Sequence, residues 1–224
     1  MGNLLTSTIG RKLIMSVSGL FLVLFLLFHM SMNLAAVFST EAYNAICEFL
    51  GANWYALAGT LILAAGVVVH LVYATVLTLH NRSSRGSQRY AMTAEPEGVT
   101  WASRNMYVLG IIIVLGLLLH LYNFWYNMQF AEIIGNHELG PFPPADGAAY
   151  IAALFSSPVY CIIYLVWFAA IWFHLTHGFW SAFHTIGWDN QTWLPRLKRI
   201  ANVVATIVFL CFALVVIVFY LRSL

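Results

Sequence analysis

The stretch LIMSVSGLFLVLFLLFHMSMNLAAVFST, residues 13–40, contains no Asp, Glu, Lys or Arg. Four further stretches are also free of charged residues: 49–81, 105–131, 147–188 and 200–221. Each stretch exceeds the ~20 apolar residues that a helix needs to cross a bilayer. The 224-residue chain is 62% hydrophobic and only 8% charged, which excludes an ordinary soluble domain. The sequence therefore predicts an all-α integral membrane protein in which five transmembrane helices form a bundle.

We expect a single membrane domain over residues 1–224. Its helices are predicted at approximately 12–38, 54–81, 104–130, 158–186 and 196–221. The first helix begins too late and runs too long for a cleaved signal peptide, so we expect it to be retained. The connection 133–158 contains Pro141, Pro143 and Pro144, and we expect it to be irregular with a short helix.

The positive residues are unevenly divided between the two sides of the membrane that the five predicted helices would cross. Nine of the ten fall on the side of the N-terminus: Arg11, Lys12, Arg82, Arg85, Arg89, Arg104, Arg196, Lys198 and Arg199. The other side has only Arg222. Because short loops rich in Lys and Arg stay in the cytoplasm, we predict a cytoplasmic N-terminus and a C-terminus on the outside.

Four histidines lie inside the first four predicted helices: His29, His70, His120 and His174. At a rise of about 1.5 Å per residue, His29 and His120 lie about 24–25 Å from the cytoplasmic start of their helices. His70 and His174 lie about 24 Å from the outer start of theirs. The four residues therefore form an outer pair, His29 with His120, and an inner pair, His70 with His174.

A histidine inside a membrane is costly unless something satisfies it. A single one can serve as a hydrogen-bond partner for a neighbouring helix. Four at paired depths favour bis-histidine ligation of two haem irons that are stacked across the membrane.

Three glycines share a helix face with a predicted iron ligand, because residues four positions apart lie one above the other. They are Gly66 before His70, Gly116 before His120 and Gly178 after His174. A glycine there lets a porphyrin plane lie close to the backbone, so we predict that these glycines pack against haem. His29 has Phe25 and Asn33 at the equivalent positions.

Two other ligand sets remain open. His177 competes with His174, because it lies three residues away on a neighbouring face. Alternatively, His80 and His184 could complete two pairs on the second and fourth helices, ten residues from His70 and His174 respectively. Ten residues turn the face of an ideal helix by about 80°, which works against that scheme. It would also leave the other two intramembrane histidines unused.

A polar cluster lies beside the outer pair and is the candidate quinone site that the family resemblance described below implies. Asn123 and Asn127 share a face with His120, Asn33 reaches a similar level, and Trp125 lies nearby. Glu48 lies just beyond, at the outer mouth, where a carboxylate could carry protons. The alternative interpretation is an ordinary interfacial belt of amide and aromatic residues.

A second candidate quinone site lies near the inner pair, around Ser16, Ser18 and His80. Four basic residues at that end are candidates for pairing with haem propionates: Arg11, Lys12, Arg82 and Arg85. The three cysteines form no C-x-x-C and no C-x-x-C-H motif. That argues against an iron–sulfur cluster or a covalently attached haem in this chain.

Two stretches resemble a known family. Residues 18–33, SGLFLVLFLLFHMSMN, resemble the first helix of the cytochrome b subunits of succinate dehydrogenases and fumarate reductases. Residues 173–180, FHLTHGFW, resemble the fourth helix of that family, with its H-x-x-x-G pattern. The order of the helices and histidines extends the resemblance over essentially the whole chain. It is closest to the single-chain, dihaem branch.

The resemblance implies a membrane-anchoring subunit that transfers electrons between a quinone, expected to be menaquinone, and two partner subunits. A flavoprotein subunit with covalent FAD would interconvert succinate and fumarate, and an iron–sulfur subunit would relay the electrons. Both would dock on the cytoplasmic side of a bacterial inner membrane. The two cofactors of this chain would be haem b, a proximal one on His70 and His174 and a distal one on His29 and His120.

Two other functions fit the same pattern. One is the haem b subunit of a different respiratory complex, of the formate dehydrogenase, hydrogenase or b561 type. The other is a transporter whose histidines relay protons. Haem content and co-purifying subunits separate these alternatives.

Overall fold

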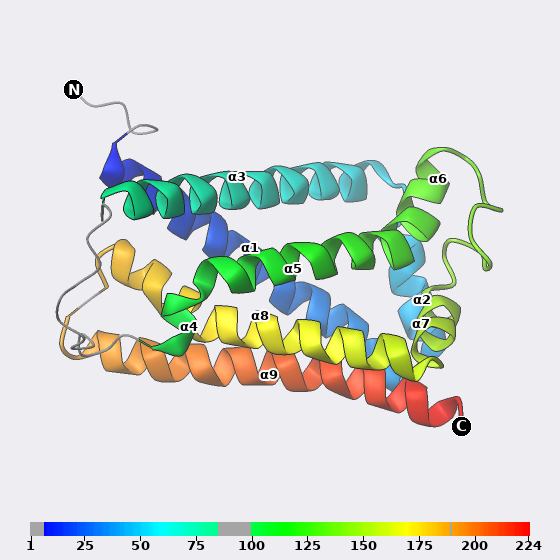
Figure 1. The fold of residues 1–224 in the computed structure, drawn as a ribbon. Coiled ribbons are helices and arrows are strands. Elements are labelled where there is room, and N and C mark those ends of the chain that lie inside the picture. Colours follow the sequence, from blue (N-terminus) through cyan, green and yellow to red (C-terminus); the bar gives the residue numbers. More distant parts are fainter. Residues whose placement is uncertain (1–6, 85–99, 189) are drawn as a thin grey trace.

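The fold is described from a computed structural model, in which residues 7–84, 100–188 and 190–224 are placed. Helices dominate these residues, and no strand occurs among them. Figure 1 shows long helices stacked side by side. Their bounds are Thr8–Phe38 for α1, Trp54–Ser84 for α3, Met106–His120 for α5, Pro158–Thr185 for α8 and Trp193–Arg222 for α9.

Five helices of the described chain are long and apolar enough to cross a membrane. The third of them is composite, because α5 continues as a π-helix, η1 (Leu121–Phe130), and then as α6 (Ala131–Ile133). The predicted five-helix membrane architecture is confirmed. The chain is thus a multi-pass membrane protein.

The starts of three long helices differ from the predicted ones. α1 begins at Thr8 instead of residue 12, because the Ser7 side chain accepts a hydrogen bond from the Gly10 N–H at 3.1 Å. α9 begins at Trp193 instead of residue 196, with Pro195 in the first turn, where a missing N–H is tolerated. The third span begins at Met106, because a separate short helix, α4 (Trp101–Arg104), precedes it.

Two short helices lie together at one end of the bundle, which the charge pattern predicts to face outside and which we call the outer end (Figure 1). α7 (Gly147–Phe155) is the short helix expected within residues 133–158. α2 (Thr40–Phe49) was not predicted; Ser39 ends α1 and caps α2 by accepting from the Ala42 N–H at 3.1 Å. The Asn44 side chain joins the two short helices, donating to Asp146 at 2.8 Å.

Four of the long helices form a square, with α9 packed against two of them. α1 packs beside α3 and α8, and α5 packs beside α8, whereas α3 and α5 meet only briefly. Neither α1 with α5 nor α3 with α8 is an extensively packed pair of the described helices. α1 and α5 therefore lie on one diagonal of the square, and α3 and α8 on the other.

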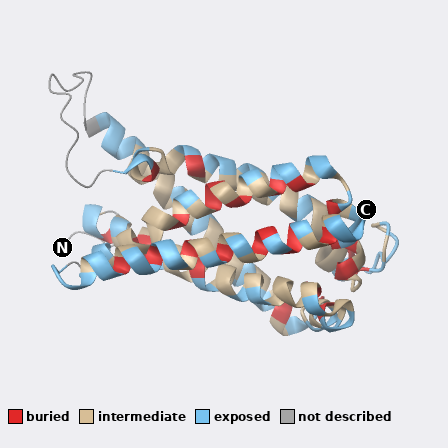
Figure 2. Ribbon diagram, turned by 90° about the horizontal axis from the view of Figure 1, so that it is seen from below, coloured by how far each residue is buried: buried red, intermediate tan, exposed pale blue. Residues whose placement is uncertain are grey.

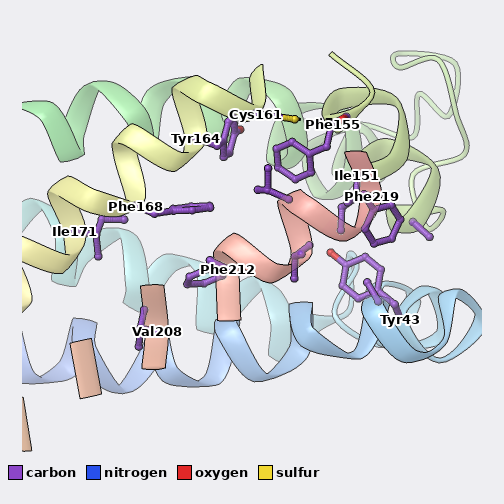
Figure 3. Close-up of a cluster of buried hydrophobic side chains, with 14 of the residues drawn as sticks. Tyr43, Ile151, Phe155, Cys161, Tyr164, Phe168, Ile171, Val208, Phe212 and Phe219 are labelled. Atoms are coloured by element: carbon purple, nitrogen blue, oxygen red, sulfur yellow. Dashed lines mark hydrogen bonds between the residues drawn. The ribbon is translucent and has the colours of Figure 1, made fainter. Parts of the chain in front are cut away.

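The apolar core is concentrated toward the outer end, where α7, α8 and α9 meet α1 (Figure 3). Phe168 and Phe212 stack there with ring centroids 5.2 Å apart, and Val216 is only 1% exposed. Exposed positions extend along the bundle in Figure 2, and on α3 they include Leu61, Ile62 and Val68. So much exposed apolar surface is what a bilayer would solvate.

Candidate functional site

The structure brings the four intramembrane histidines together in two pairs. His29 of α1 meets His120 of α5, with ring centroids 5.7 Å apart and planes at 86°. His70 of α3 meets His174 of α8, with centroids 6.3 Å apart and planes at 69°. Each pair crosses a diagonal of the helix square, where the two backbones do not pack extensively.

These separations are of the size that a shared metal ion requires. A histidine nitrogen binds a transition metal at about 2.0 Å, so two nitrogens on opposite sides of one ion lie about 4 Å apart, with ring centroids about 6 Å apart. The described residues contain no group of three or more His, Cys, Asp or Glu side chains that could hold a metal alone. Two histidines that would share one iron would leave its other positions to a planar ligand such as a porphyrin.

Two ring nitrogens of these four histidines have no partner among the described residues. The Nδ1 atoms of His120 and His174 are buried and form no hydrogen bond. Buried polar groups are nearly always satisfied, and an exception points to a missing water, ion or ligand. The unsatisfied nitrogens therefore fit a site that holds a further group.

Ser18 lies beside one ring nitrogen of His70. Its hydroxyl donates to the Met15 carbonyl at 3.0 Å and lies 3.4 Å from His70 Nδ1. A hydroxyl that donates to a carbonyl can also accept through its oxygen, and the Nδ1–H tautomer of His70 would donate that hydrogen bond. Nε2 then keeps a free lone pair, as in histidines that bind metals while donating from the other nitrogen.

The outer pair is surrounded by aromatic rings. Phe25 stacks on His29 with centroids 5.4 Å apart, while Phe124 and Trp167 lie 5.1 and 5.6 Å from His120. These residues line the pair with flat apolar surface, which suits an aromatic macrocycle.

The rival histidines occupy different surroundings. His177 packs against Trp180, with centroids 4.9 Å apart, and its buried Nδ1 also lacks a partner. The ring that faces His70, however, belongs to His174. His80 and His184 are exposed, unlike the four paired histidines. The structure thus favours the pairs expected from depth over the scheme that uses these two residues.

Aromatic side chains of this chain cover two of the three predicted haem-packing glycines. A Cβ at Gly66 would lie 2.7 Å from the Phe21 ring, and one at Gly116 would overlap the Trp167 ring. Gly178 is less crowded, with His174 Cδ2 3.9 Å from its Cβ position. A porphyrin in contact with the backbone at the first two glycines requires Phe21 and Trp167 to rotate away.

Two of the predicted quinone residues lie beside the outer pair. Asn33 Nδ2 is 3.4 Å from the His29 ring nitrogens. Asn123 donates to the Tyr164 hydroxyl at 3.1 Å, and Tyr164 lies 6.3 Å from His120 between ring centroids. Tyr164 is 2% exposed and was missed in the sequence, although a tyrosine in the middle of an apolar span is a signal that could have found it.

The other predicted quinone residues have different partners. Asn127 donates to the backbone carbonyls of Tyr122 and Asn123. Trp125 donates to Gln129, at 2.9 Å. Glu48 is exposed and lines a shallow outer hollow together with six other residues: Glu41, Asn44, Ala45, Pro143, Ala145 and Asp146. The predicted cluster is therefore divided, and only its asparagines at positions 33 and 123 flank the histidines.

An open apolar groove of about 380 Å³ lies between α1 and α2. Six residues line it: Phe28, Met32, Ala45, Ile46, Phe49 and Leu50. Its lining is apolar, and Phe28 and Phe49 are exposed, so the groove is open to the surroundings of the bundle. The sequence did not predict it, because no helix was expected between residues 38 and 54.

The candidate propionate residues Arg11, Lys12 and Arg82 lie at the end of the bundle opposite α2 and α7. Arg11 precedes Ser18 by two helical turns, about 10 Å, so it is the nearer candidate to the inner pair. Arg82 follows His70 by twelve residues of α3, about 18 Å. Arg85 lies outside the described residues.

No family model, no curated protein and no solved structure matches this chain.

Proposed function

We propose that this chain is the membrane-anchoring dihaem cytochrome b subunit of a succinate:quinone or quinol:fumarate oxidoreductase. The observation that carries the proposal is the juxtaposition of two histidine pairs across the two diagonals of one helix square. A diagonal is where two helices stand far enough apart for a ring system between them. The resemblance of residues 18–33 and 173–180 to that family supports the choice among haem b subunits.

Each proposed ligand has a role that follows from its surroundings. His70 and His174 would hold the inner haem, with the Ser18 hydroxyl beside Nδ1 of His70. His29 and His120 would hold the outer haem. Bound haem supplies one-electron transfer between its two iron oxidation states. Arg11, Lys12 and Arg82 would neutralise propionates at the inner end.

The proposed quinone site adjoins the outer pair. The Asn33 and Asn123 amides and the Tyr164 hydroxyl supply hydrogen-bonding groups for quinone carbonyls. The open apolar groove between α1 and α2 would suit the isoprenoid tail of a quinone. The flavoprotein and iron–sulfur subunits would dock on the opposite, basic side, where complementary charge favours association.

The first experiment is to purify the chain with its natural complex and record reduced-minus-oxidised spectra and haem content. We expect two haem b per chain, with a flavoprotein and an iron–sulfur subunit in the same complex. Partners of the formate dehydrogenase or hydrogenase type would reassign the complex but keep the haem sites. Absence of haem b would overturn the proposal and favour a transporter.

A single substitution tests the pairing. His120→Ala should remove one haem and leave the other, because the pairs share no ligand. The matched control is His137→Ala, in the exposed outer loop, which should retain both. Simultaneous loss of both haems in a folded His120→Ala protein would contradict two independent sites.

A further inference from the structure

A chain of polar contacts runs from the short helix α2 to the outer histidine pair. Tyr43 of α2 is only 8% exposed, and its hydroxyl donates to Asn33 Oδ1 at 3.2 Å. Asn33 lies one turn after His29 on α1 and donates from Nδ2 to the His29 carbonyl at 2.9 Å. Both ends of the Asn33 amide are therefore engaged, one by α2 and the other by α1.

The Asn33 amide also touches the His29 ring. Its Nδ2 is 3.4 Å from both ring nitrogens, so it lies between them and does not point at one. On the N-terminal side, Phe25 stacks on the same ring at an interplanar angle of 16°. The His29 imidazole therefore lies between Phe25, four residues before it, and Asn33, four residues after it. These two contacts limit its rotation.

In this contact chain, His29 and Asn33 belong to the membrane-spanning helix α1, whereas Tyr43 belongs to the short helix α2. Burial raises the pKa of the Tyr43 phenol well above its ordinary value, so the hydroxyl stays a donor at physiological pH. α2 itself is held in place by its Ser39 cap and by the hydrogen bond from Asn44 to Asp146. The position of the donor thus depends on the outer end of the fold.

We propose that Tyr43 is a positioning residue for His29, acting through Asn33, so that α2 controls the orientation of one ligand of the outer haem. The inference rests on the proposed haem function and extends it to a residue outside the membrane-spanning helices. Groups that orient a metal ligand alter metal affinity about 10- to 100-fold when they are removed. They also tune the properties of the bound group.

The test is Tyr43→Phe, which removes the hydroxyl and keeps the ring in the core. We expect one of the two haems to shift its midpoint potential and its axial-ligand spectrum, and to be lost about tenfold more readily. The other haem should be unchanged. The matched control is Tyr55→Phe, because Tyr55 donates to the Phe49 carbonyl at 2.7 Å in the same outer region and has no contact with Asn33.

A double substitution tests whether the effect passes through Asn33. Asn33→Leu should produce a shift in the same haem, and adding Tyr43→Phe should not enlarge it, because among the described residues the Asn33 amide is the hydrogen-bonded link from Tyr43 to His29. Additive shifts would overturn the proposed route. A Tyr43→Phe protein with two haems and wild-type potentials would overturn the inference but leave the haem function standing. Absence of haem from the wild-type protein would overturn the proposed function itself.

Discussion

At the scale of the residue, polar groups in the apolar bundle have specific neighbours. The Trp172 indole donates to Thr206 of α9 at 3.0 Å, and Trp167 donates to the Ile113 carbonyl of α5 at 3.1 Å. Inside a membrane an unsatisfied donor costs several kcal/mol, which is why each indole is paired. The buried nitrogens of His120, His174 and His177 depart from this pattern.

Substitution of two neighbouring histidines distinguishes an iron ligand from a residue that only packs against its neighbours. His174→Ala should remove the inner haem, because the ring opposite His70 disappears. His177→Ala should retain both haems, since that ring packs against Trp180 instead. Quantification of haem per chain in the two variants checks the assignment. Haem loss in the His177 variant with retention in the His174 variant would reverse it.

At the scale of the element, the connections carry as much specific structure as the spans. Arg222, the one basic residue predicted on the outer side, donates to the Val37 carbonyl at the end of α1, at 2.8 Å. A cation there complements the negative end of the α1 dipole. The π-helix η1 follows His120 directly, and such segments are frequent at functional sites.

Glu132 gives an element-scale prediction. Its carboxylate accepts from the Ala52 N–H just before α3, at 2.7 Å, and closely approaches Gly51. Glu132→Ala should lower the free energy of unfolding by about 1–3 kcal/mol, because a backbone donor loses its partner. Thermal unfolding in detergent measures the change. Glu138→Ala, in the exposed loop, is the control, and equal stability of the two variants would contradict the structural role.

At the scale of the whole molecule, the packing of five spans leaves two diagonals open. α8 and α9 form the best-packed part of the bundle with α1, whereas α3 lies at the periphery. The histidines of the two peripheral helices, α3 and α5, each reach across to a central helix, α8 or α1. This arrangement concentrates the candidate chemistry in the parts of the bundle where backbones are not in contact.

The orientation in the membrane is a prediction for the intact protein. Nine basic residues on one side should keep the N-terminus in the cytoplasm and place the C-terminus outside. A reporter enzyme active only outside the cytoplasm should therefore be active when fused after Leu224 and inactive when fused after Arg104. The reverse result would invert the topology and move the proposed partner subunits to the other side.

Hydropathy was enough to predict the five spans, because a membrane helix satisfies its backbone within itself and its length follows from the bilayer. The depths of the four histidines followed from the same regular rise. Whether the paired rings point toward each other did not follow from the sequence, since rotation about each helix axis and the choice of diagonal depend on how all five helices pack. The same holds for Tyr43: its helix forms in a connection, and only the tertiary fold places its hydroxyl against Asn33.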